Sequence, residues 1–146
     1  MAAGWTGSGS AGPEGADVLI AGEATGGRFA LVQTVEVRGG EPPRHRHERE
    51  DEILHVLDGA LRVWIAGAWV EAPAGTTVVL PRGVEHGFVV AASRTRLLTA
   101  LSPAGFEGFY RETAGLSNPI DLDRLVAMAA RYGCEITGPS PREPGR

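Results

Sequence analysis

Short apolar segments separated by glycine- or proline-containing turns run through most of the chain, and this pattern constrains the fold more than any other feature. Two of these turns, Asp58-Gly59 and Pro81-Arg82-Gly83, have residue types typical of tight connections between strands. Strands that return about every 8 to 12 residues indicate a sandwich or barrel rather than a bundle of long helices. The sequence therefore predicts an all-β fold.

Several of the apolar segments alternate with period two, as half-buried strands do. Within residues 28–38, one face carries the side chains Phe29, Leu31, Val35 and Val37. The predicted strands are residues 17–21, 28–38, 53–57, 61–66, 68–72, 76–80, 87–91 and 96–101.

The periodicity becomes helical after Pro103. A spacing of i, i+3, i+4 and i+7 is formed by Phe106, Phe109, Tyr110 and Thr113. Asp121 is placed to cap a second helix, which Gly133 would end. The two helices are expected to close one end of a barrel or to cover a dimer surface, and the alternative is a lid over a ligand.

Composition divides the chain into four parts. Residues 1–16 are rich in Gly, Ser and Ala and are expected to form a disordered leader. Residues 17–102 would form the barrel, 103–137 a helical extension, and 138–146 a flexible tail with several prolines. The first residues lack the basic start and apolar stretch of a secretory signal, so we expect a cytoplasmic protein.

Charge and cysteine content exclude several classes of protein. The net charge is -4, which argues against a nucleic-acid binder with a broad basic face. The apolar runs are far shorter than the roughly 20 residues of a membrane span. Cys134 is the single cysteine, so neither a disulfide framework nor a multi-thiolate zinc site is available. We expect Cys134 to be a buried, small apolar residue. We expect the binding partner of the protein to be a small-molecule substrate.

Histidines and carboxylates are spaced for metal binding. His45 and His47 would point to the same side of an extended segment, because side chains alternate along a strand. Glu52 opens the next strand, and His86 follows the turn before a later one. Three imidazoles and one carboxylate suit a divalent transition metal, namely Fe, Mn, Ni, Cu or Zn.

Other nearby groups are weighed as alternatives. Glu50 or Asp51 would replace Glu52 if the turn before the strand were wound differently. His55 lies three residues after Glu52, an odd spacing that turns it to the opposite face, so it is excluded as a ligand. Phe88 and Val90 share the face of His86 and are predicted to line the substrate pocket.

The spacing of the four donors resembles the paired motifs of the cupin superfamily, G(X)5HXH(X)3-4E(X)6G and G(X)5PXG(X)2H(X)3N. The first is matched from Gly39 to Gly59 and the second from Gly75 through His86, while Val90 stands at the closing Asn position. The chain resembles small single-domain bacterial cupins of the quercetin dioxygenase-like group. The resemblance implies a double-stranded β-helix (jelly-roll) barrel, a metal at the four donors, and a homodimer.

Three functions are compatible with such a centre. The preferred hypothesis is a metal-dependent oxygenase for a compact, partly apolar substrate with a chelating oxygen pair, in which Glu52 also acts as a base. The alternatives are a non-redox cyclase or isomerase for a polyketide-type substrate, and a binding module without turnover. Trp64 would face either the cavity or the outer surface.

Overall fold

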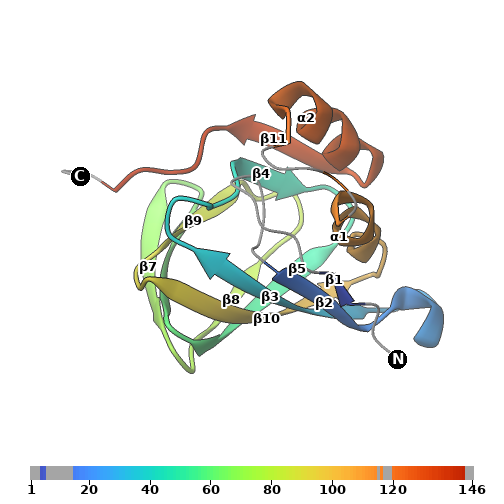
Figure 1. Cartoon of the computed structure of the whole chain (residues 1–146), viewed down its shortest axis with the longest axis horizontal. Coiled ribbons are helices and arrows are strands. Elements are labelled where there is room, and N and C mark those ends of the chain that lie inside the picture. Colours follow the sequence, from blue (N-terminus) through green and yellow to red (C-terminus); the bar gives the residue numbers. More distant parts are fainter. Residues whose placement is uncertain (1–3, 6–14, 115, 117–119, 144–146) are drawn as a thin grey trace.

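A computed structural model describes residues 4–5, 15–114, 116 and 120–143, and its strands form two antiparallel sheets packed face to face (Figure 1). The first sheet contains, in order, β1 (Gly4–Trp5), β2 (Gly15–Ile20), β3 (Ala30–Val37), β10 (Arg94–Ser102), β5 (Asp51–Asp58) and β8 (Thr77–Leu80). The second contains β11 (Cys134–Gly138), β4 (Arg44–His47), β9 (His86–Val90), β6 (Ala60–Ile65) and β7 (Ala68–Pro73). The predicted double-stranded β-helix is confirmed.

The interior is filled by alternate residues of strands from both sheets. On β6, Leu61 and Val63 are buried, and Phe88 and Val90 of β9 lie opposite them in the strand register. One cluster of the core consists of Leu54, Val56, Leu61, Val63, Ala72, Val78, Leu80, Phe88, Val90 and Leu97. This packing holds strands of the two sheets together.

Strand β3 turns its less apolar face toward the interior of the barrel. The side chains that point inward are Ala30, Val32, Thr34 and Glu36. The face that alternation marks as apolar, with Val35 and Val37, is instead half-exposed on the outside of the six-stranded sheet, and Phe29 just before the strand is exposed. Period two leaves two faces to choose from, and closure of the barrel selects the inner one.

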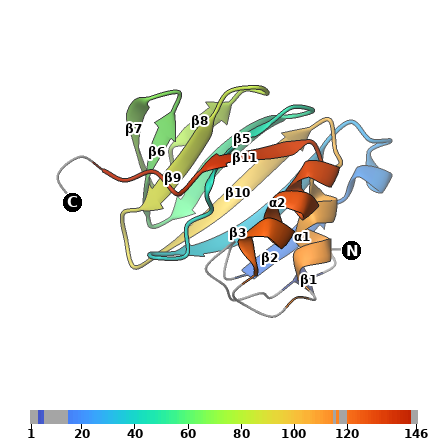
Figure 2. The same cartoon turned by 90° about the horizontal axis from the view of Figure 1, so that it is seen from above.

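The helices α1 (Glu107–Thr113) and α2 (Leu122–Arg131) lie together on one side of the barrel, next to β11 (Figure 2). The Asp121 side chain accepts hydrogen bonds from the backbone N–H groups of Asp123 and Arg124, as predicted for an N-cap. Phe106, before α1, and Ala129, on α2, pack against Val32 and Leu101 of the barrel in a second core cluster. A short 3-10 helix, η1 (Gly22–Ala24), precedes β3. None of the helices in the described part of the chain is long and apolar enough to span a membrane.

Strand β11 is not among the predicted strands, since residues 134–138 were placed in the helical extension and tail. Strands β4 and β1 are also absent from that prediction, and β1 lies within the segment expected to be a disordered leader. Strand β11 pairs with β4, with Cys134 opposite His47 and Ile136 opposite His45. Residues beyond Gly138, expected to be a loose tail, also contact the barrel as far as residue 143. The Ser140 hydroxyl donates to the carbonyl of Glu41, and Arg62 forms a 2.7 Å ion pair with Glu143. Strand β11 provides hydrogen-bond partners for the backbone groups along this edge of β4, which would otherwise lack them.

Candidate metal centre

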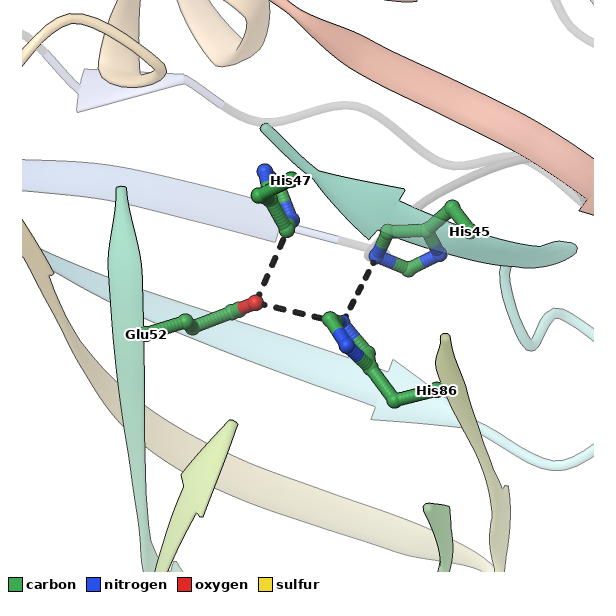
Figure 3. Close-up of side chains that lie close together, drawn as sticks. All are labelled: His45, His47, Glu52 and His86. Carbon is green, nitrogen blue, oxygen red and sulfur yellow. Dashed lines mark hydrogen bonds and ion pairs between the residues drawn. The ribbon is translucent and has the colours of Figure 1, made fainter. Parts of the chain in front are cut away.

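Four side chains from three strands converge inside the barrel (Figure 3). His45 and His47 extend from β4, Glu52 from the start of β5, and His86 from the start of β9. One ligand atom from each lies within 4.8 Å of every other. The Nε2 atoms of His45 and His86 are 3.1 Å apart, and Glu52 Oε2 lies 3.2 Å from His47 Nε2 and 3.3 Å from His86 Nε2. The structure thus brings together the four predicted ligands.

Local pairing explains why residues distant in sequence meet here. His45 is directly opposite His86 in the antiparallel register of β4 and β9. The turn before β9 is attached to β4, because the Gly83 N–H donates to the His47 carbonyl at 2.7 Å. On the other side, the Glu48 N–H donates to the Gly133 carbonyl, which connects the turn after β4 to the end of α2.

Each histidine uses its Nδ1 atom for a contact away from the centre. His45 Nδ1 is 2.7 Å from the Pro43 carbonyl, and His86 Nδ1 is 3.1 Å from the Val84 carbonyl. A carbonyl oxygen only accepts hydrogen bonds, so these two rings carry their proton on Nδ1 and present the Nε2 lone pair to the centre. Such outer contacts orient metal-ligating histidines in proteins.

Glu50 supplies the third outer contact. Its Oε1 atom is 2.7 Å from His47 Nδ1, and both side chains are buried. The alternative in which Glu50 replaces Glu52 as a ligand is therefore not what the structure shows. Asp51, the other alternative, is bonded to the backbone N–H of Arg82 at the protein surface.

The electrostatics of the cluster fit a cation. Burial, together with the charges of His86 and His47, lowers the pKa of His45 to about 3. Burial also acts to lower the pKa of His47, but Glu52 and Glu50 raise it to about 9. Burial acts to raise the pKa of Glu52, yet contacts with His47 and His86 hold it well below its ordinary value. Glu52 Oε2 is buried and is held by ion-pair contacts with His47 and His86, so a divalent cation would replace the proton of the His47 pair and coordinate this oxygen.

A cavity of about 80 Å³ opens beside the four donors. Its walls are mainly apolar and include Leu54 and Phe88 from the strands and Phe106 and Leu125 from the helical region. Of the two residues predicted to line the substrate pocket, Phe88 lines this cavity, whereas Val90 does not and belongs to the core cluster. Two residues along a strand span about 6.6 Å, which moves Val90 away from the donors into the filled core.

The structure also shows where three other residues from the sequence analysis lie, namely His55, Trp64 and Cys134. His55 is outside the cluster, and its Nδ1 contacts the Thr77 hydroxyl at 2.8 Å, as its exclusion predicted. Trp64 is on the outer face, where the guanidinium of Arg44 lies over its ring at 5.3 Å. Cys134 is buried as predicted, and burial raises the pKa of its thiol.

The sequence analysis missed the polar part of the cavity wall. Thr34 and Glu36 of β3 and Thr99 of β10 line the cavity and are buried. The sequence does contain an indication of this polar wall, because Thr34 and Glu36 occupy alternate positions of a segment whose other face is apolar. It did not reveal which face would turn inward.

Known proteins resemble the chain over the region that holds the cluster. The sequence family described as "Cupin domain" matches residues 31–100. Quercetin 2,3-dioxygenase of Bacillus subtilis (strain 168) is 26% identical over 94 residues, which are 64% of this chain and 28% of that protein. This chain therefore spans less than a third of that relative.

Solved structures share the arrangement of strands. The polyketide cyclase RemF from Streptomyces resistomycificus aligns with a TM-score of 0.56 and 27% identity, covering 69% of this chain and 73% of that one. KdgF from Halomonas sp. aligns with a TM-score of 0.58 and 23% identity, covering 64% and 82% of the two chains. The second similarity concerns the fold alone.

Proposed function

Because this chain belongs to the cupin superfamily as a small member, we propose that it is a metal-dependent oxygenase whose ion is held by His45, His47, Glu52 and His86. The observation that carries the proposal is the convergence of three imidazole Nε2 atoms and one carboxylate oxygen, with every Nδ1 atom already engaged outside the cluster. A donor set of this kind suits Fe, Mn, Ni, Cu or Zn.

A bound divalent transition metal would supply a Lewis-acidic and, for some of these ions, redox-active centre for the oxygen atoms of a substrate. The protein contributes orientation and shielding. Leu54, Phe88 and Phe106 make the wall beside the donors apolar, which favours a compact, partly apolar substrate and excludes water from it.

Glu52 is proposed to have a second role as the base. Its Oε2 atom faces the centre, 3.2 Å from His47 Nε2 and 3.3 Å from His86 Nε2, and belongs to a carboxyl that stays ionised near neutral pH because its pKa is lowered. It is thus placed to accept the proton of a substrate hydroxyl that approaches the cluster. The similarity to quercetin 2,3-dioxygenase supports the oxygenase form of the proposal.

A specific observation also favours a second candidate, a metal-dependent cyclase or isomerase. The structure of a polyketide cyclase is similar over 73% of its length, whereas this chain covers only 28% of the dioxygenase. In this candidate the same cluster would polarise a carbonyl or enolate without consuming oxygen.

Metal analysis and oxygen uptake distinguish the candidates. The protein is purified without added metal, its metal content is measured, and oxygen consumption is followed with catechols, flavonols and β-diketones. Uptake that disappears in Glu52→Gln and persists in His55→Ala supports the oxygenase. Zinc occupancy with no uptake and with ring-closed product supports the cyclase. Tight binding without any product indicates a binding module instead, and absence of metal binding contradicts both the oxygenase and the cyclase.

We further propose that the chain forms a homodimer through the outer face of the six-stranded sheet. Ile53, Leu57 and Val79 are 40%, 38% and 57% exposed there, and Ile53 is paired directly with Val79. Ala100 of β10 lies between Ile53 and Leu31 of β3 on this face. By contrast, Val35 and Val37 of β3 lie opposite the exposed Arg96 and Arg94. Strand β8 ends this sheet, so its outer edge is available for contact as well.

A further inference from the structure

A buried carboxyl that the proposed metal site does not use lines the same cavity. Glu36 extends inward from β3, in the six-stranded sheet, and is 5% exposed. Its Oε2 atom has no hydrogen-bond partner among the described residues. Thr34, two residues earlier on the same face, provides a hydrogen bond to the carboxyl. The carboxyl therefore has a hydrogen bond with Thr34 and lines the cavity, while its Oε2 atom is left without a partner among the described residues.

Burying such a carboxyl lowers the stability of the folded protein. Burying a carboxyl without full hydrogen bonding costs about 1–3 kcal/mol or more, so native proteins seldom keep one in a core position without a role. Burial raises the pKa of Glu36 to about 8, and the nearby Glu41 and Glu52 carboxylates act in the same direction. In the metal-free protein at neutral pH the group is thus mostly a neutral acid that is able to donate a hydrogen bond.

Glu36 comes from a strand that carries none of the four residues of the metal cluster. The ligands come from β4, β5 and β9, whereas Glu36 and Thr34 come from β3. The rest of the wall is largely apolar, with Leu54, Phe88 and Leu125 among its side chains. The cavity consequently offers a polar position on its β3 side in addition to the metal cluster, and apolar side chains make up much of the remaining wall.

We propose that Glu36 is a substrate-positioning residue that hydrogen-bonds an oxygen substituent of the ligand other than the pair held at the metal cluster. This inference rests on the proposed function, and it narrows the substrate class. The ligand is a small ring compound with a chelating oxygen pair and a further hydroxyl or carbonyl group elsewhere on the ring.

Two probe compounds that differ in one hydroxyl test this directly. Kojic acid and allomaltol carry the same chelating hydroxyl and carbonyl, and kojic acid has one additional hydroxyl on the substituent across the ring. Binding of each is measured by calorimetry on the zinc-loaded protein and its Glu36→Leu variant. We expect the original protein to prefer kojic acid by about fivefold to tenfold, the usual range for one hydrogen bond. Glu36→Leu should lose that preference while its zinc content and allomaltol affinity stay the same, and the outward-facing control Gln33→Leu should keep it.

A second measurement, the melting temperature, separates failure of the Glu36 inference from failure of the proposed function. The melting temperature of metal-free Glu36→Leu should be higher than that of the original protein, because the variant buries no unpartnered oxygen. A lower melting temperature would show that Glu36 supports the fold, and a kojic acid preference that is absent from the original protein or retained in the variant would equally overturn the inference. If neither compound binds although zinc does, the chelating substrate class of the proposed function fails, and the melting temperature alone then decides the role of Glu36.

Discussion

The imidazole of His47 and the carboxylate of Glu50 are joined by a 2.7 Å contact between Nδ1 and Oε1, and both side chains are 2% exposed. The contact makes Glu50 an orienting partner of a metal ligand, because it fixes the ring so that Nε2 faces Glu52 at 3.2 Å. An acceptor in this position also increases the basicity of the ligating nitrogen.

Replacing Glu50 should therefore weaken metal binding without removing a ligand. We expect Glu50→Leu to lower zinc affinity by about 10- to 100-fold, the range observed for outer partners of metal-bound histidines. Glu50→Gln should lose less, because its amide oxygen still accepts from Nδ1. Competition with a chromophoric chelator measures both affinities, and Glu48→Gln, on the surface of the same turn, is the control. Unchanged affinity in Glu50→Leu would contradict this role.

Removal of a ligand should abolish metal binding and leave the barrel folded. His47→Ala leaves the core cluster around Leu61 and Val63 intact, since the ligands take no part in it. We expect no bound metal by elemental analysis and a far-ultraviolet circular dichroism spectrum like that of the original protein. His55→Ala, outside the cluster, should retain the metal. An unfolded His47→Ala variant would show instead that the metal is structural.

The stability of the metal-free protein should depend on pH through Glu36. Burial raises its pKa from 4.5 to about 8, so between these values the folded protein holds a proton that the unfolded chain has released. The free energy of unfolding therefore falls as the pH rises through this range, by on the order of a few kcal/mol from this group. Glu36→Gln has no such proton, so its stability relative to the original protein should increase from pH 5 to pH 8. Urea unfolding at several pH values measures the difference, and a constant difference would contradict the assignment.

The last glycine of the first motif should be much less replaceable than the first glycine of the second. Gly59 has φ +88°, and a Cβ there would lie 2.5 Å from the Arg94 carbonyl oxygen. Gly75 has φ +89° but no atom within 4 Å of such a Cβ. Gly75→Ala should thus cost about 1–2 kcal/mol for its backbone conformation alone. Gly59→Ala should cost a further 1–3 kcal/mol or so for the clash. Equal shifts in the urea midpoint of the two variants would contradict this explanation.

If the protein forms the proposed dimer, a charge introduced on the outer face of the six-stranded sheet should lower its mass in solution. Val79→Arg places a cation at a 57% exposed position and should convert the dimer to monomer while leaving the metal content unchanged. Sedimentation equilibrium measures the mass. Arg46→Glu, on the other sheet, serves as the charge-changing control. A monomeric original protein would contradict the dimer and leave the metal centre unaffected.

Local spacing was sufficient to predict most of the barrel and all four proposed ligands. The i, i+2 relation places His45 and His47 on one side of β4 whatever their surroundings, and the turn chemistry around Gly59 and Gly83 determines where strands begin. The odd spacing of His55 from Glu52 excludes it in the same way. These are properties of one or two neighbouring elements, so a sequence carries them without knowledge of the rest of the chain.

Tertiary structure decided which sides of the strands face the cavity and what closes it. Alternation on β3 offers either the face of Val35 or the face of Glu36, and the more apolar face is the outer one. The pairing of Cys134 with His47 joins segments far apart in sequence, and the short β11 has no periodicity long enough to predict it. Inward direction and edge pairing depend on how two sheets close around a shared core, which is a relation among many distant residues rather than a local preference.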